Sequence, residues 1–407
     1  CEPTKKAFST KYIKYVSCTI KMTEENSVPL QFKCFSPNLA DNSPLHLEPR
    51  SGHRIVVDES DLYCLGGYNP DFWDIPNEEG SGTTYPLFAE LWRFNFATRQ
   101  WTLLKTKGQM PVELASHTLL KCGRHLIHLA GTGVPFGINK SNMVTSIDLK
   151  DLHWKQLNCS GELPLPIYGH TVTKVGEYVY VMGGTTGYVY HMEVHRLNLK
   201  SLYWEHLTKE SKEWKCVKNI PVPRYRHEVV HLDGKLYVFG GGTGVEAYSL
   251  KKIPAFDIGT HTWEKIVTVP DIIHGFPKPR KCHSCVQMEN EVYVCGGLTK
   301  ERCILPCLWK FCLYTHKWTK LSVELQVPVY FHSADLTQAG CMYIFGGITH
   351  YEDKRTNIIQ KIWLKIPSLM EMCWERLCNL IEMEKYAKDK TVLINLGIPR
   401  HLMDRIS

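Results

Sequence analysis

The chain has 407 residues, of which 43% are hydrophobic and 22% charged, a balance typical of a folded protein with a sizeable core. The 48 Lys and Arg outnumber the 41 Asp and Glu by only seven, too few to indicate a nucleic-acid-binding protein. No run of about 18 apolar residues is present, which excludes a membrane-spanning helix.

The N-terminal segment, residues 1–44, is basic and contains one β-rich run at residues 12–20. Since the first residue is Cys1 rather than Met, we expect further residues before it. The chain has 16 cysteines, scattered through strand-like runs and not spaced as in a small disulfide-rich domain. We therefore expect reduced thiols and a cytoplasmic or nuclear location.

A repeat occupies residues 45–366. An apolar run ends in a Gly pair five times, and a sixth copy ends in Ala130-Gly131. A histidine stands 13 residues before the pair in five copies and 14 before it in the last. The histidines are His53, His117, His170, His227, His283 and His332. Such a period indicates a repeat architecture.

Each repeat contains enough strand-like sequence for four short strands. Two runs rich in Val, Ile and Tyr flank a turn between the histidine and the Gly pair. A third apolar run then precedes a tryptophan in five copies, at Trp101, Trp154, Trp204, Trp263 and Trp318. Four antiparallel strands are the content of one propeller blade, so the predicted fold is an all-β, six-bladed β-propeller.

These residues resemble the kelch repeat, in which a Gly pair is followed at a distance by a tryptophan. In this pattern the histidine is better explained as a structural residue than as a metal ligand or catalytic group. The sixth repeat lacks the tryptophan, because Pro367 follows Ile366 directly. We expect the N-terminal segment, through residues 12–20, to supply the missing strand and close the ring.

The C-terminal tail, residues 367–407, changes to helical periodicity. Pro367-Ser368 is a helix start, and apolar residues then recur at three- and four-residue spacing. A second helix is expected at about residues 391–406. The simplest interpretation is that both helices pack under the propeller.

The first tail helix also resembles a BC box, the motif that docks a helix on elongin C. The resemblance makes Leu369, Cys373 and Leu377 the residues that would enter the elongin groove. A propeller followed by such a helix is similar to the kelch-domain substrate receptors of cullin-2 RING ubiquitin ligases. That family implies elongin B/C and cullin-2 as partners, protein C-termini as ligands and a cullin box at Ile398–Leu402. The preference for cullin-2 over cullin-5 comes from the resemblance.

The candidate substrate site lies on the loops that precede the first strand and follow the second strand of each blade, because these loops open on one face. Substrate-binding candidates are Arg226, Tyr225, Tyr168, Ser51, Lys281, Tyr330, Tyr68 and Tyr188. The family's arginine directly after a Gly pair has no counterpart here, so Arg226 is the expected partner of a terminal carboxylate, with Ser51 and Lys281 as further donors. An equally good interpretation makes Arg226 structural, paired with Glu228 or a loop carbonyl.

Two other classes of function remain open. A kelch propeller can carry a copper-radical oxidase, but the sequence shows no catalytic motif, and the two cysteines of Cys282–Cys285 would point to opposite sides of a strand. We therefore expect no catalytic residue, no metal site and no cofactor. A cytoskeletal or signalling scaffold without a ligase role is the alternative.

Overall fold

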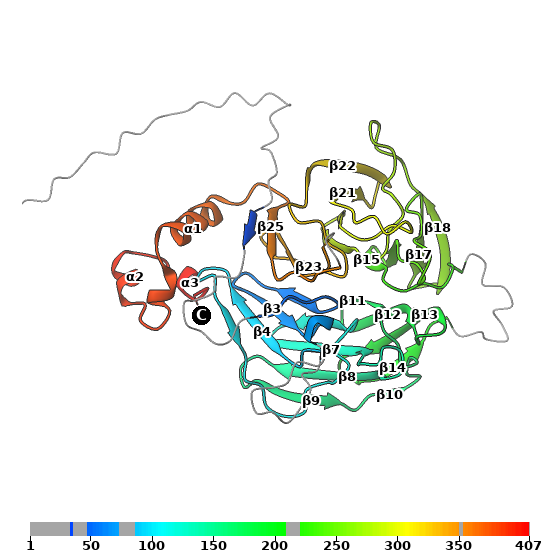
Figure 1. Cartoon of the computed structure of the whole chain (residues 1–407), viewed down its shortest axis with the longest axis horizontal. Coiled ribbons are helices and arrows are strands. Elements are labelled where there is room, and N and C mark those ends of the chain that lie inside the picture. The colour runs from blue at the N-terminus through cyan, green and yellow to red at the C-terminus, as the bar shows by residue number, and fades with distance from the viewer. Residues whose placement is uncertain (1–32, 36–46, 73–85, 209–219, 350–352, 407) are drawn as a thin grey trace, which may run out of the picture.

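The chain forms six sheets arranged in a ring, each sheet being one blade of a propeller (Figure 1). The computed structural model describes residues 33–35, 47–72, 86–208, 220–349 and 353–406. The strands of each blade are hydrogen-bonded in chain order, with two exceptions: the last blade takes one strand from the N-terminal segment, and the third blade adds a short strand that precedes its first strand in the chain. This architecture confirms the predicted six-bladed β-propeller.

The first three blades are built from the N-terminal half of the chain. Blade 1 contains β2 (Arg54–Val57), β3 (Asp61–Leu65), β4 (Leu91–Asn95) and β5 (Trp101–Leu103), with a 3-10 turn η1 (Pro70–Phe72) after β3. Blade 2 contains β6 (Thr118–Cys122), β7 (His125–Thr132), β8 (Lys140–Asp148) and β9 (His153–Leu157). Blade 3 contains β11 (Thr171–Val175), β12 (Tyr178–Thr185), β13 (Tyr190–Asn198) and β14 (Tyr203–His206), with the short β10 (Ser160–Gly161) parallel to β14.

The other three blades follow. Blade 4 contains β15 (Glu228–Leu232), β16 (Lys235–Phe239), β17 (Lys252–Asp257) and β18 (Thr262–Val267). Blade 5 contains β19 (Ser284–Met288), β20 (Glu291–Cys295), β21 (Cys307–Cys312) and β22 (Lys317–Glu324). Blade 6 contains β23 (Ser333–Leu336), β24 (Cys341–Phe345), β25 (Ile359–Trp363) and β1 (Lys33–Phe35).

The core is divided among the gaps between neighbouring blades. Six apolar clusters each join two adjacent blades, including blades 6 and 1. The repeated tryptophans Trp154, Trp204, Trp263 and Trp318 are buried in these gaps, as large apolar side chains should be. Each blade therefore depends on both neighbours for burial of its faces.

The repeated histidine also packs between two blades. At the closure of the ring, Gly346 of blade 6 lies against His53 of blade 1, and a Cβ on Gly346 would come within 2.5 Å of His53 Cε1. His53 Nε2 is 3.1 Å from the carbonyl oxygen of Phe345. Burial holds the pKa of His53 well below its usual value, so the ring is neutral. Its surroundings are those of a packing residue.

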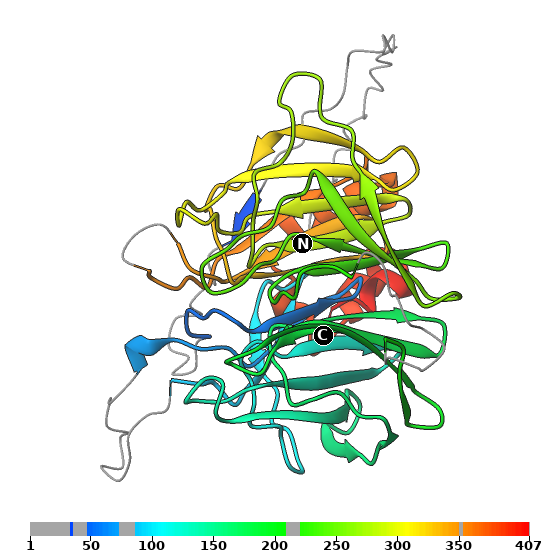
Figure 2. The ribbon, with the colours of Figure 1, turned by 90° about the vertical axis from the view of Figure 1, so that its right-hand side faces the viewer.

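The N-terminal segment supplies the outer strand of blade 6, but not with the expected residues. The strand paired with β25 is β1, with Lys33 opposite Lys361 and Phe35 opposite Ile359. Figure 2 shows β1 in blue beside the orange strands of the last blade. The β-rich run at residues 12–20, which was expected in this place, lies outside the described residues.

The tail begins with helix α1 (Leu369–Leu380), whose first turn is capped by Ser368 Oγ accepting from Glu371 N–H. The second expected helix, residues 391–406, is wrong in its extent. It is broken into α2 (Thr391–Asn395) and α3 (Arg400–Met403), with a 3-10 turn η2 (Met383–Tyr386) before them. Gly397 takes a φ of +77°, and Pro399 follows two residues later, so one continuous helix cannot form. No helix in the described part of the chain has the length and apolar character to cross a membrane.

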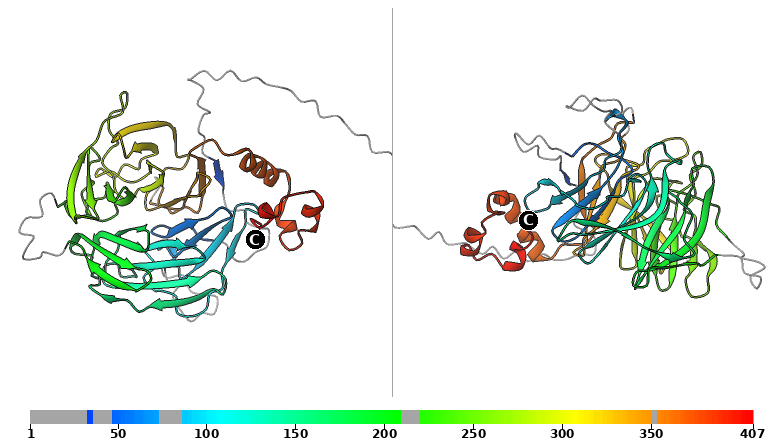
Figure 3. Two further views of the ribbon diagram at one scale, coloured as in Figure 1. Left: turned by 180° about the vertical axis from the view of Figure 1, so that it is seen from behind. Right: turned by 90° about the horizontal axis from the view of Figure 1, so that it is seen from below.

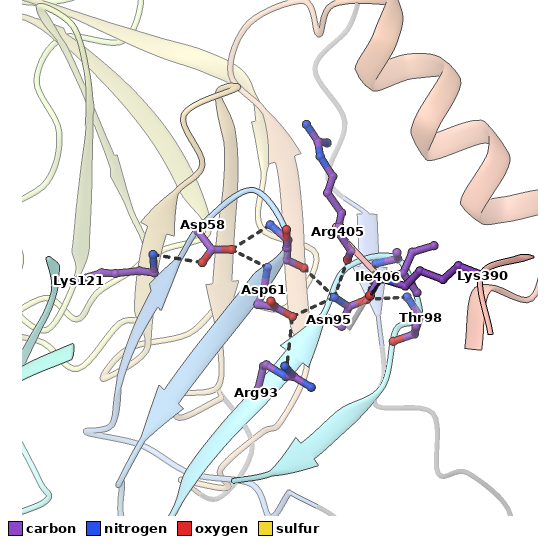
Figure 4. A network of polar contacts seen from close by, with 11 residues as sticks. Asp58, Asp61, Arg93, Asn95, Thr98, Lys121, Lys390, Arg405 and Ile406 are labelled. Atoms are coloured by element: carbon purple, nitrogen blue, oxygen red, sulfur yellow. Dashed lines mark hydrogen bonds and ion pairs between the residues drawn. The ribbon is translucent and has the colours of Figure 1, made fainter. Parts of the chain in front are cut away.

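The tail packs on the outside of the ring beside blades 6 and 1 (Figure 3). Its apolar core includes Trp374, Met383, Leu393, Leu402, Met403 and Ile406, and Ala97 of blade 1 completes it. Asn95, 2% exposed, donates to Arg405 O at 2.8 Å and to Asp61 Oδ1 at 2.9 Å (Figure 4). Arg405 in turn forms a two-pronged ion pair with Glu371 of α1 at 2.8 and 2.9 Å.

Helix α1 is tied to blade 6 through Glu375. Its carboxylate is 3.3 Å from Lys361 Nζ, 2.5 Å from Lys33 Nζ of β1, and accepts from Trp363 Nε1 at 3.1 Å. Burial acts to raise the pKa of Glu375, but Lys361 and the two donors outweigh it and hold that pKa at about 2. The helical tail therefore spans the junction at which the ring closes.

Candidate functional site

A cavity of about 230 Å³ opens at the end of the propeller where the expected loops meet. Its lining combines aromatic, hydroxyl and guanidinium groups. The lining residues are Ser51, Gly52, Tyr68, Ala115, Ser116, Thr132, Phe136, Tyr168, Tyr225, Arg226, Phe331, Ile348 and Arg355. Within the part of the chain that the structure describes, this set contains two arginines and no carboxylate, histidine or cysteine, so it favours binding of an anionic group over proton transfer.

The two sets of loops meet because each pair is joined by a short β-bridge. The residue two before the repeated histidine pairs with the residue after the Gly pair of the same blade, as in Ser51 with Tyr68 and Tyr168 with Thr185. These bridges continue the pairing of the first two strands beyond their ends. The histidine and Gly pair of the sequence pattern therefore also determine which residues face the cavity.

Six residues, one from each blade, form a closed ring of backbone hydrogen bonds around the axis. Each N–H donates to the carbonyl of the equivalent residue in the preceding blade, at 2.7–3.1 Å. The residues directly precede the repeated histidines and are Gly52, Ser116, Gly169, Arg226, Cys282 and Phe331. Their φ angles lie between 55° and 69°, which costs about 1–2 kcal/mol for each residue other than glycine. Because these six amides donate within the ring, they are not available to hold a ligand in the cavity.

Arg226 projects from this ring into the cavity. One guanidinium nitrogen donates to Ser116 Oγ, and the guanidinium carbon lies 4.4 Å from the centre of the Phe331 ring. The buried Nε has no partner among the described residues, and burial lowers the pKa of the group. The alternative is a structural pairing of Arg226 with Glu228 or a loop carbonyl. Neither pairing is present among the described residues, and Glu228 Oε1 instead lies 3.4 Å from Arg54 Nη1. Arg226 therefore keeps donor capacity toward the cavity.

A second guanidinium in the cavity, that of Arg355, was missed from the sequence. It lies 5.5 Å from the Tyr68 ring, and its Nε donates to Ser51 Oγ at 3.4 Å. Arg355 forms a β-bridge with Ile348 across a loop of blade 6. The equivalent position is occupied by Leu87 in blade 1 and by Ala247 in blade 4. The loops differ in length, so no fixed spacing from the Gly pair marks this position. The sequence indicates this position only through the point at which the chain returns from the loop to the third strand.

The structure brings five of the eight candidate substrate residues together and leaves three outside the cavity. Ser51, Tyr68, Tyr168, Tyr225 and Arg226 line it. The other three are accounted for elsewhere. Lys281 Nζ donates to Thr243 O at 2.6 Å and Gly244 O at 2.8 Å, Tyr330 Oη donates to Asp353 at 3.0 Å, and Tyr188 is 82% exposed. Lys281 is thus not an available carboxylate donor, since it holds a loop of blade 4.

The three candidate elongin anchors do not have equal exposure. Leu369 is 72% exposed and Cys373 is also exposed, whereas Leu377 is partly buried against the apolar core of the tail. The opposite side of α1 buries Trp374 and Glu371. An apolar face of α1 that includes Met372 and Leu380 therefore points to solvent.

The cavity and the tail lie at opposite ends of the strands. The cavity is lined by Tyr68, which follows β3, whereas the tail contacts Asn95 and Ala97, at the far end of β4. Since β3 and β4 are antiparallel, with Leu65 opposite Leu91 and Asp61 opposite Asn95, these are the two ends of one blade. A ligand in the cavity and a partner on the tail would not compete for the same surface.

Comparisons with known proteins agree with the repeat and extend beyond it. The attractin/LZTR1 beta-propeller model matches residues 127–362, and the KLHDC2/KLHL20/DRC7 kelch-repeats domain matches residues 33–213. Kelch domain-containing protein 10 of Rattus norvegicus is 44% identical over 372 residues, covering 89% of this chain and 87% of the relative. The Homo sapiens protein of that name is 44% identical over 364 residues, which cover 88% of this chain and 79% of the relative. The Drosophila melanogaster homolog is 38% identical over 383 residues, which cover 88% of this chain and 61% of the relative. The chain therefore belongs to the kelch domain-containing protein 10 family.

Proposed function

We propose that this protein is a substrate-recognition subunit of a cullin-2–elongin B/C RING ubiquitin ligase. In this proposal the cavity binds the C-termini of target proteins, and the tail carries the rest of the ligase. The protein itself supplies no catalytic group. The observation that carries the proposal is the exposed apolar face of α1, with Leu369 and Cys373 at the BC-box positions, directly after the last propeller strand.

The chemistry of the cavity supports a carboxylate ligand. A carboxylate leaves water only when charged donors replace its hydration, and a guanidinium can provide two parallel hydrogen bonds. Arg226 and Arg355 provide such donors, and Ser51 and Ser116 add hydroxyls. Among the described residues, no acid lines the cavity, so none of them would repel the ligand or neutralise the arginines.

The position of the tail supports an adaptor role. Glu375 and Arg405 fix α1 to the propeller through its buried side, so the exposed side is held in a defined direction. An apolar helix face of this kind fits a partner groove. Val392, Ile394 and Leu396 around α2 are also exposed and lie in the region that cullin-2 would contact. A location in the cytoplasm or nucleus is part of the proposal, and the free thiols of the described cysteines support it.

The elongin contact can be tested with the double variant Leu369→Arg, Cys373→Lys. Charged side chains should prevent entry into an apolar groove, and elongin B/C should no longer co-purify with the protein. The fold should be unchanged, because both side chains are exposed. Co-purification and the thermal midpoint of unfolding would be measured together.

A matched control is Ile272→Arg with Ile273→Lys, which places the same charges on two isoleucines that are 88% and 85% exposed in a loop of the propeller. The control should retain elongin B/C. Retention by the α1 double variant would reject the adaptor role and favour a kelch scaffold without a ligase function.

A further inference from the structure

A group of metal-binding side chains lies on the outer part of blade 3, away from the cavity and the tail. Glu193 and His195 are on β13, and His206 is on β14. One potential ligand atom from each residue lies within 4.8 Å of the others. The strand register produces this group, because residues 193 and 195 share one face of β13 and His195 pairs directly with His206.

The two imidazoles of this cross-strand pair lie face to face. Their ring centres are 4.2 Å apart and the rings are nearly parallel, at 8°. His195 is 5% exposed. Unlike the repeated histidines, neither residue precedes a first strand or fills the space beside a Gly pair, so the propeller pattern does not account for them.

The negative charge beside the two imidazoles favours a bound cation. It comes from the carboxylate of Glu193, which belongs to the group, and from the carboxylate of Glu162 near His195. An imidazole binds a metal ion through one ring nitrogen, so each histidine can provide one ligand atom.

We propose that Glu193, His195 and His206 bind a divalent first-row transition-metal ion such as Zn²⁺. Two imidazoles and one carboxylate bind such ions in preference to Mg²⁺ or Ca²⁺. A water molecule can occupy the fourth coordination position. Thr208 Oγ1, 3.1 Å from His206 Nε2, helps to orient that ring. The side chain of Glu193 is 44% exposed and can rotate to shorten its distance to the imidazoles; in the structure it lies 3.9 Å from His191 Nδ1.

The bound ion would connect β13 to β14, the last full strand of blade 3. Zinc bonds to nitrogen are about 2.0–2.1 Å long, so one ion can join two strands at the separation of a direct cross-strand pair. The role that follows is a clamp on the outer edge of this blade, independent of ligand binding in the cavity.

The test uses the full chain and compares three variants with the wild type. His206→Ala removes one ligand, and Glu193→Gln replaces another with a neutral group of the same size at a part-exposed position. The control, His153→Ala, removes a histidine from the outer strand of blade 2. Zn²⁺ affinity would be measured by competition with a chelator at pH 7. The Co²⁺-loaded protein would be examined by absorption, because thiolate ligands give a strong near-ultraviolet band and imidazole and carboxylate do not.

We expect one Zn²⁺ site without thiolate ligands in the wild type and the control. Loss of a residue that only orients a metal ligand costs about 10–100-fold in affinity, so loss of a direct ligand should weaken binding by at least about 100-fold. Glu193→Gln gives an answer even if His206→Ala impairs folding. Equal Zn²⁺ affinity in the wild type and Glu193→Gln, or a site with thiolate ligands only, would overturn the proposal.

Discussion

The two ends of the propeller are held in different ways. At the cavity end, a ring of six backbone hydrogen bonds joins the blades, and the side chain of Arg226 adds contacts to Ser116 and Phe331 of the same ring. At the tail end, side chains make the attachment, through the Glu371–Arg405 and Glu375–Lys361 ion pairs and the amide of Asn95. The cavity can therefore change its side chains while the blades stay in place. The tail cannot change its anchoring residues without losing its position.

Because of this difference, side chains at the cavity can vary independently of the residues that attach the tail. The position occupied by Arg226 is Gly, Ser, Cys or Phe in the other blades, although all six share one backbone conformation. Such a frame allows different ligands to be selected by substitution at a few positions. The tail anchors, in contrast, serve one fixed orientation of α1.

The largest effect is expected from Arg405→Met, which removes the Glu371–Arg405 ion pair at the tail end and leaves the cavity end unchanged. The change leaves Glu371 buried without its partner, and the loss of one member of a buried ion pair costs about 3–5 kcal/mol. The tail should detach, and its amides should exchange hydrogen faster, while the thermal midpoint of the propeller changes little. Hydrogen exchange followed by mass spectrometry measures both regions at once. Arg400→Met, on the exposed side of α3, is the control, and unchanged exchange in the tail of Arg405→Met would show that the apolar contacts suffice.

The next effect concerns Arg226→Ala, which alters the cavity end alone. Peptides that end in small residues with a free carboxylate should bind the wild type, and amidated peptides should not. Removing one partner of a buried charge pair costs about 2–5 kcal/mol, so the variant should bind well over tenfold more weakly. Fluorescence polarisation with labelled peptides measures this loss, and elongin binding should be unaffected.

Arg355→Ala should also weaken the binding of free-acid peptides. The loss should be smaller than for Arg226→Ala, because Arg355 also donates to Asp353 O. Arg302→Ala is the matched control, since this exposed arginine pairs with Asp353 outside the cavity. Equal binding of free-acid and amidated peptides would replace carboxylate capture with recognition of an internal peptide segment.

The smallest effect is expected from shortening the N-terminal segment. This change tests the outer strand of blade 6 and its contact with the tail. Deletion of residues 1–36 removes β1 and the Lys33–Glu375 ion pair. With each hydrogen bond contributing about 0.5–1.5 kcal/mol, the loss should be about 1–3 kcal/mol in the free energy of unfolding. Deletion of residues 1–25 keeps β1 and should have little effect. A thermal midpoint lowered equally by both deletions would assign the stabilisation to residues before 26.

Much of the fold could be predicted because the repeat carries its own evidence. The spacing of His53 and its equivalents from the Gly pairs identifies the first two strands of each blade, and Ser368 marks the start of α1. The apolar periodicity of residues 391–406 predicts one long helix, but Gly397 and Pro399 interrupt it. The closing strand was placed at residues 12–20 on composition, although Lys33–Phe35 occupies that place, since a three-residue strand has almost no sequence signal.

The candidate sites divide along the same line. Local periodicity along the chain is enough to predict the six blades, the face on which the loops open, and Arg226 as a cavity residue. The folded structure is needed to find that Lys281 donates to backbone carbonyls, that Arg355 lines the cavity with Arg226, and that His195 pairs with His206. The physical reason is that loop lengths and strand register set these distances across the fold. No spacing along the chain encodes them.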